Sequence, residues 1–120
     1  MAAESLAREK VLVEVNDGEE SRRVTMLEGE SLVLLERTSG PDTEVAYGAW
    51  SHTHKMTFSR EAGASALGVA ADDVERALGE LFDPAQGEAL LADVMDRFDQ
   101  TEAKYTYLSW SDDGDIAYRA

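Results

Sequence analysis

Apolar and polar residues alternate in short runs through the first half of the chain, and glycine-containing turns separate these runs. Such alternation is typical of strands with one buried face, and Asn16-Asp17-Gly18 is a strong hairpin-turn signal. Residues 52–59 alternate most clearly, with His52, His54 and Phe58 on one side. The pattern predicts strands over residues 10–15, 21–27, 31–37 and 52–59, and a further strand that starts within 44–50.

The periodicity changes from 2 to 3.6 residues after residue 59, which indicates helices. An alanine-rich stretch over 60–70 predicts a short first helix. Asp72, followed three residues later by Glu75, has the spacing of a capping box and predicts the start of a second helix. Asp83 and Pro84 are the start signals of a further helix, whose apolar stripe runs to residue 98.

The end of the chain returns to the strand pattern. Residues 104–111 and 115–119 flank Asp112-Asp113-Gly114, which predicts a C-terminal β-hairpin. The apolar run over 32–35 predicts a strand that is buried on both faces. Strands, then helices, then a hairpin indicate one α+β domain over residues 1–120. We expect an antiparallel β-meander of about four to five strands, two or three helices and the hairpin.

Composition excludes some kinds of site and indicates a cellular compartment. The 120 residues contain 43% hydrophobic residues and no cysteine, so a single core can form and thiolate metal sites and disulfides are excluded. No apolar run approaches the ~20 residues of a membrane span, and residues 1–10 lack the apolar region of a signal peptide. We therefore expect a cytoplasmic protein.

Acidic charge is the strongest compositional signal. The chain has 25 Asp and Glu against 11 Lys and Arg, a net charge of −14. Residues 71–102 hold ten acidic residues and two arginines, so this helical segment alone has a net charge of −8. A soluble small domain needs a net charge of only roughly 2–8. Such a surface repels nucleic acid and anionic membranes and attracts basic protein surfaces.

From this charge we expect a binding protein that inhibits a basic partner, either a nuclease or a nucleic-acid-binding complex. Carboxylates spaced along a helix can occupy a cleft that otherwise neutralises phosphates. Nucleic-acid mimics such as anti-CRISPR and anti-restriction proteins belong to this class, as do immunity proteins that block nuclease toxins. Two tyrosines of the last strands are expected to anchor the partner. The expected partner-binding residues are Glu75, Glu80, Glu88, Asp93, Asp96, Asp99, Tyr105 and Tyr107.

Two other functions stay open. His52 and His54 share one side of a strand near Tyr47 and Trp50, so a metal- or small-ligand-binding protein is the first alternative. The second is a structural or oligomer-forming domain whose acidity, together with only three lysines, reflects adaptation to high salt.

Catalytic signals are poor. The chain has no cysteine and two histidines, and it lacks a nucleophile-elbow or phosphate-binding glycine motif. We expect neither an enzyme nor a cofactor. The pattern does not determine the oligomeric state.

Overall fold

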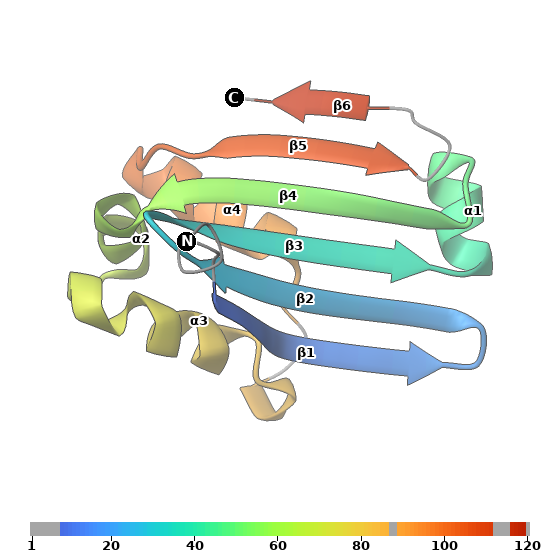
Figure 1. The fold of residues 1–120 in the computed structure, drawn as a ribbon, viewed down its shortest axis with the longest axis horizontal. Helices are drawn as coiled ribbons and strands as arrows, with labels where there is room; N and C mark the ends of the chain where they lie inside the picture. The colour runs from blue at the N-terminus through green and yellow to red at the C-terminus, as the bar shows by residue number, and fades with distance from the viewer. Residues whose placement is uncertain (1–7, 87–88, 112–115, 120) are drawn as a thin grey trace, which may run out of the picture.

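A computed structural model describes residues 8–86, 89–111 and 116–119, the last segment by its backbone alone. Its centre is a six-stranded antiparallel sheet in which strands lie in the order of the sequence, from β1 to β6 (Figure 1). Each strand therefore pairs with its neighbours in the chain, which is the meander predicted from the alternating pattern. The strands are β1 (Arg8–Asp17), β2 (Glu20–Glu28), β3 (Ser31–Ser39), β4 (Ser51–Ser59), β5 (Thr106–Ser111) and β6 (Ile116–Arg119).

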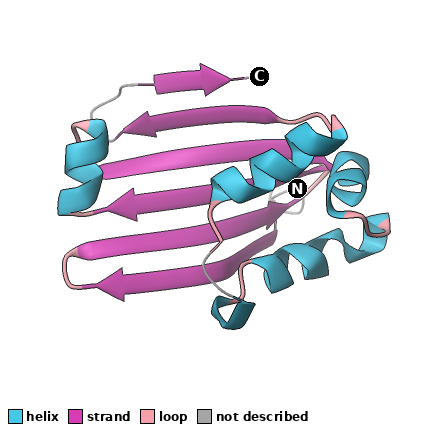
Figure 2. Cartoon of the chain, turned by 180° about the vertical axis from the view of Figure 1, so that it is seen from behind, coloured by secondary structure: helices cyan, strands magenta, loops and turns pink. Residues whose placement is uncertain are grey.

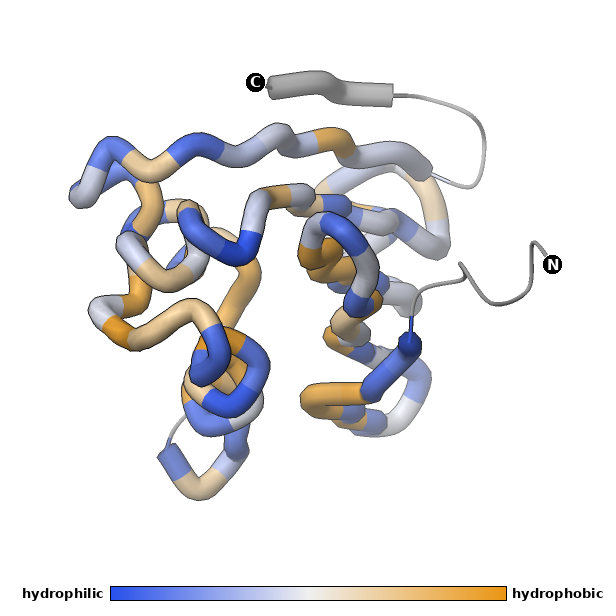
Figure 3. Tube along the Cα trace, turned by 60° about the vertical axis from the view of Figure 1, so that its left-hand side comes forward, coloured by the Kyte–Doolittle hydropathy of each residue, from blue (hydrophilic) through white to orange (hydrophobic). Residues whose placement is uncertain are grey.

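Among the described residues there are four α-helices, slightly more than the two or three expected. Seen from behind, α2 to α4 cover one end of one face of the sheet, while α1 packs at the opposite end (Figure 2). A third view shows α2 to α4 beside the sheet as a layer of their own (Figure 3). The helices are α1 (Pro41–Tyr47), α2 (Arg60–Leu67), α3 (Val74–Leu81) and α4 (Leu91–Thr101).

The hydrophobic core lies between the sheet and the layer of α2 to α4. Phe58 of β4 packs against Phe98 of α4, with their ring centroids 4.7 Å apart. Gly63 lets α2 approach closely, because a Cβ there would lie 3.0 Å from both Phe58 and Val74. The fully buried core side chains come from three strands and two helices. They include Val24, Met26, Leu32, Leu34, Met56, Val74, Leu78, Val94 and Phe98.

The other face of the sheet has no helix over it within the described chain (Figure 1). Val33 and Leu35 project to this face, as do Leu108 and Trp110, and all four are half-buried. The prediction that the 32–35 run is buried on both sides is therefore wrong for its second face. No helix of the described residues is long and apolar enough to cross a membrane.

Helix α1 replaces the strand that was predicted to start within 44–50. Its signals are Pro41 at the first turn and Gly48 at the end, where a φ of 75° closes the helix. With seven residues it is too short to be stable alone. A carboxylate oxygen of Glu20 on β2 accepts a hydrogen bond from the Asp42 amide at 2.7 Å, so tertiary contact supplies the missing cap.

Gly40 is required where β3 turns into α1. Its φ is 129°, and a Cβ there would lie 2.7 Å from the carbonyl oxygen of Glu19. Its amide donates a hydrogen bond to the Trp50 carbonyl at 2.9 Å, which ties both ends of the α1 segment together. This close packing fixes α1 beside the ends of β2, β3 and β4.

The helices of the acidic segment begin later than their capping signals predict. Asp72 lies in a 3-10 turn over Ala71–Asp73 with no side-chain cap, and α3 begins at Val74. Asp83 caps a 3-10 turn over Pro84–Gln86, where it accepts the Ala85 amide at 2.9 Å. Each capping signal therefore precedes or lies in a single 3-10 turn, and the α-helix begins after that turn. The predicted hairpin turn at Asp112-Asp113-Gly114 lies outside the described residues.

Candidate functional site

The predicted anionic residues do not form one uniform array. Asp93, Asp96 and Asp99 are exposed on α4, on the side opposite its buried stripe. Asp93 also accepts the Leu90 amide at 2.8 Å and so stabilises the start of α4. The side chain of Glu80 on α3 is 69% exposed. These residues form the acidic surface of α3 and α4; Glu88 lies outside the described residues.

Glu75 lies apart from that surface. It forms an ion pair with Arg60, and its side chain is only 22% exposed. Burial raises the pKa of Glu75, but hydrogen bonds, chiefly from Arg60, outweigh burial and hold the pKa below its usual value. The pair joins α3 to the start of α2, so Glu75 stabilises the helical layer.

A groove of about 960 Å³ runs beside the acidic surface, between α3 with the end of α2 on one side and α4 on the other. Five apolar and five polar residues of the described chain line it. We call its apolar residues the floor, which consists of Leu67, Val69, Ala77, Leu81 and Ala89, and its polar residues the rim, which consists of Glu80, Asp83, Gln86, Asp93 and Arg97. We call this the α3–α4 groove. Its carboxylates and its single arginine leave it a net negative charge.

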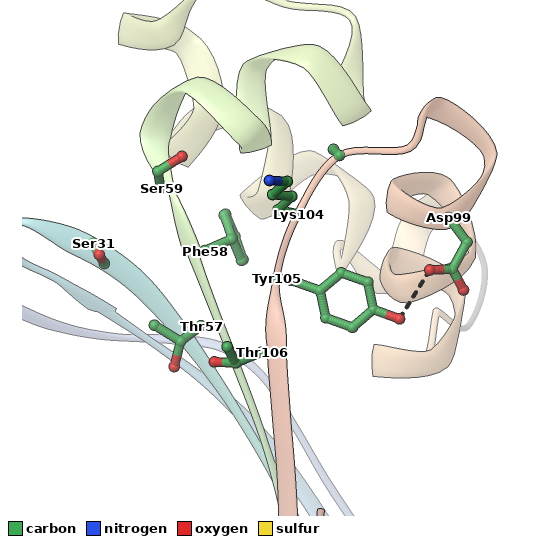
Figure 4. A pocket seen from close by; sticks show the side chains of 9 residues that line it. Ser31, Thr57, Phe58, Ser59, Asp99, Lys104, Tyr105 and Thr106 are labelled. Carbon is green, nitrogen blue, oxygen red and sulfur yellow. Dashed lines mark hydrogen bonds between the residues drawn. The ribbon is translucent and has the colours of Figure 1, made fainter. Parts of the chain in front are cut away.

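A second cleft, of about 680 Å³, lies at the far end of α4 (Figure 4). Here the structure brings two predicted residues together, because the Tyr105 hydroxyl donates to an Asp99 carboxylate oxygen at 2.9 Å. The Tyr105 ring packs edge-on against Phe98, with the centroids 5.7 Å apart. Tyr105 is therefore held against the core.

Tyr107 and both histidines meet at the opposite end of the sheet. We call Tyr47, His52, His54 and Tyr107 the Tyr–His cluster. The Tyr47 ring stacks on His52 with centroids 3.9 Å apart and an interplanar angle of 2°. Its hydroxyl is hydrogen-bonded to Nε2 of His54 at 3.2 Å, and Nδ1 of His54 is hydrogen-bonded to the Tyr107 hydroxyl. Nδ1 of His52 lies 2.7 Å from the Ser111 hydroxyl.

The cluster favours a neutral His54. Burial is the main cause that lowers the pKa of His54; His52 lowers it further, while Glu36 acts in the opposite direction. A neutral imidazole has one donor and one acceptor nitrogen. One tyrosine hydroxyl must then donate to His54 and the other must accept from it. Burial, and then Tyr107 and Glu36, raise the pKa of Tyr47, so that phenol stays protonated at neutral pH.

A largely buried ion pair lies beside the cluster, because Glu36 on β3 is the cross-strand neighbour of His54. Nε and Nη2 of Arg22 lie 3.0 and 2.9 Å from the same carboxylate oxygen of Glu36. That oxygen also accepts the Leu91 amide at 3.2 Å, and Arg22 donates to the Ala89 carbonyl. Glu36 therefore caps the Leu91 amide at the start of α4, next to the Leu90 amide that Asp93 caps.

Sequence reasoning singled out neither Glu36 nor Arg22. The signal for Glu36 was its place in the period-2 series Leu32, Leu34, Glu36, where a charge follows two core positions. A buried carboxylate needs a partner, and Arg22 stands two residues before Val24 on the same face of β2. The groove floor gave no such signal, because its apolar residues come from three separate segments.

Among the residues that the structure describes, no third metal ligand accompanies the histidine pair. No group of three His, Asp or Glu side chains that could hold an ion occurs in the described part of the chain. No protein-family model matches the chain, and no curated protein or solved structure matches it significantly.

Proposed function

We propose that this protein binds a basic protein partner through the acidic surface of α3 and α4. The observation that carries the proposal is the position of exposed carboxylates at a groove that accessible apolar side chains also line. Acidic side chains on a uniformly polar helix would only be hydrated. A surface with both charge and an apolar floor offers steering and buried contact area to the same partner.

The partner class follows from the chemistry of the charge. A net charge of −14 attracts a basic protein over a distance of about one Debye length. Proteins that grip nucleic acid present arginine and lysine clusters, which carboxylates can occupy in place of phosphates. We therefore propose an inhibitor of a nuclease or nucleic-acid-binding complex, as anti-CRISPR, anti-restriction and immunity proteins are.

The test is a capture experiment with identified partners. The immobilised protein is incubated with lysate of its source cells, and bound proteins are identified by quantitative mass spectrometry. The proposal expects a basic nucleic-acid-binding protein whose capture falls steeply between about 50 and 300 mM NaCl. Duplex DNA added to the lysate should compete for the same partner.

The decisive variants place the same charge change on different surfaces. Glu80→Lys with Asp96→Lys alters the acidic surface at two exposed positions that cap no helix. Glu19→Lys with Glu44→Lys makes the same change at exposed positions by the α1 end of the sheet. The first pair should abolish capture and the second should leave most of it. Equal capture by both, or capture indifferent to salt, contradicts the proposal.

A further inference from the structure

The α3–α4 groove has the shape of a site for a helix. Helix α3 has eight residues and α4 has eleven, so at 1.5 Å per residue the walls extend about 12 and 16 Å. That length matches two to three turns of a docked helix. A groove between two helices with an apolar floor is a recurring way to hold the apolar face of an amphipathic helix.

The floor specifies one face of the occupant. Ala77 and Leu81 come from α3, Leu67 and Val69 from the end of α2, and Ala89 from the segment before α4. All five are partly accessible, and all except Ala77 pack against the hydrophobic core. Such a floor accepts aliphatic side chains that recur at i, i+3, i+4 and i+7.

The charged residues that line the groove determine which side chains can flank the apolar face of the bound helix. Glu80 and Asp83 stand on one side of the groove and Asp93 on the other, and Arg97 is the one cation among the described residues that line it. An acidic flank would be repelled, whereas lysine or arginine beside the apolar face would meet a carboxylate on either side. Charge complementarity therefore selects a basic amphipathic helix over a neutral or acidic one.

We infer that the α3–α4 groove binds a basic amphipathic helix of about ten residues on the partner protein. This inference rests on the proposed function and deepens it, because it names the element of the partner that is recognised. The helix lays its apolar side chains on Ala77, Leu81 and Val69, and its basic side chains pair with Glu80 and Asp93. An anionic surface that merely imitates phosphates would not require the groove.

The test uses two fluorescein-labelled synthetic peptides of leucine and lysine with identical composition. In the first, leucines recur at i, i+3, i+4 and i+7; in the second, the order is scrambled so that no apolar face forms. Fluorescence anisotropy at about 50 mM NaCl should show that the amphipathic peptide binds about tenfold more tightly than the scrambled one. Equal affinity for the two peptides overturns the inference and leaves the proposed charge-driven function standing.

Groove variants complete the test. Ala77→Trp fills the floor and should weaken the amphipathic peptide about tenfold while scarcely changing the scrambled one. Val45→Trp, at an 88% exposed position of α1, is the matched control and should bind as the wild type does. If Ala77→Trp does not fold, as judged by circular dichroism, Val69→Ser removes an apolar contact of the groove without changing its charge and provides the same comparison. Undiminished amphipathic binding by the folded groove variant overturns the inference.

Sedimentation gives a last check on the occupant. A monomer in both wild type and Ala77→Trp agrees with a groove that is open to a partner. A dimer that Ala77→Trp dissociates would assign the groove to a second copy of this chain and overturn the inference.

Discussion

The two halves of the helix-side face of the sheet differ sharply, although the same strands build both. Towards the end of β4, Met56 and Phe58 lie in an apolar half covered by α2 to α4. Towards its start, His52 and His54 lie in a polar half bounded by α1 and the start of α4. Apolar packing holds the first half, whereas directional hydrogen bonds hold the second, in which His52 is buried and His54 is half-buried.

This difference shows that one alternating pattern can place apolar side chains in a core at one end of a strand and hydrogen-bonding side chains at the other end. Apolar contacts are non-directional, so the covered half tolerates changes that preserve volume. A buried polar group instead loses stability when its partner is removed, even where the volume is kept. Substitutions in the two halves should therefore fail for different reasons.

The largest effect is expected in the apolar half, from Phe98→Ala. Phe98 is fully buried and contacts both Phe58 and Tyr105, so its loss leaves a cavity between α4 and β4. The free energy of unfolding should fall by about 3–5 kcal/mol, measured by urea denaturation. Phe98→Leu, which keeps much of the volume, should lose clearly less. Similar losses for the two variants would show that volume does not decide stability here.

In the polar half, Glu36→Leu should destabilise the protein although the side-chain volume is kept. It keeps the approximate volume but leaves Arg22 and the Leu91 amide without their shared acceptor. The expected loss is about 1.5–3 kcal/mol in the free energy of unfolding. Adding Arg22→Met to this variant should restore part of the stability, because the unmatched charge is then removed as well. No recovery in the double variant would contradict a role of Glu36 as the partner of Arg22.

The smallest expected effect is a pH dependence that arises in the polar half. The pKa of folded His54 is lowered, mainly by burial, so the unfolded chain binds the proton more readily. The stability due to this group is complete above the unfolded pKa of about 6.5 and falls as pH drops below it towards the folded value. Thermal melts between about pH 7.5 and 5 should show this loss. His54→Gln should flatten the slope within that window; an unchanged slope would assign it to other groups.

Much of the fold could be predicted because its contacts are local. In a meander each strand pairs with the next, so short alternating runs and turn residues such as Asn16 and Gly18 define both elements and neighbours. The amphipathic stripe that runs to residue 98 also predicted the burial of Phe98, although Leu90, at the start of that stripe, is exposed. Helix α1 was missed because its cap comes from Glu20, which lies 22 residues from Asp42 in the sequence.

Some features of the candidate site also follow from local periodicity, whereas others depend on tertiary contacts. That Asp93, Asp96 and Asp99 lie opposite a buried stripe follows from the period of 3.6 residues within one helix. The pairing of Glu75 with Arg60 does not follow, and it separates this carboxylate from the acidic surface. Tyr107 likewise joins His54 only because β5 pairs with β4, which sets Tyr107 opposite Met56.

By itself, the sequence determined the meander, the amphipathic helices and the concentration of acid in residues 71–102, since each depends on local periodicity and composition. Only the tertiary structure decided which carboxylates are exposed, where the α3–α4 groove opens and that a Tyr–His cluster forms. The physical reason is that burial and hydrogen bonding depend on residues far apart in the chain, and their distances exist only once the helices pack on the sheet.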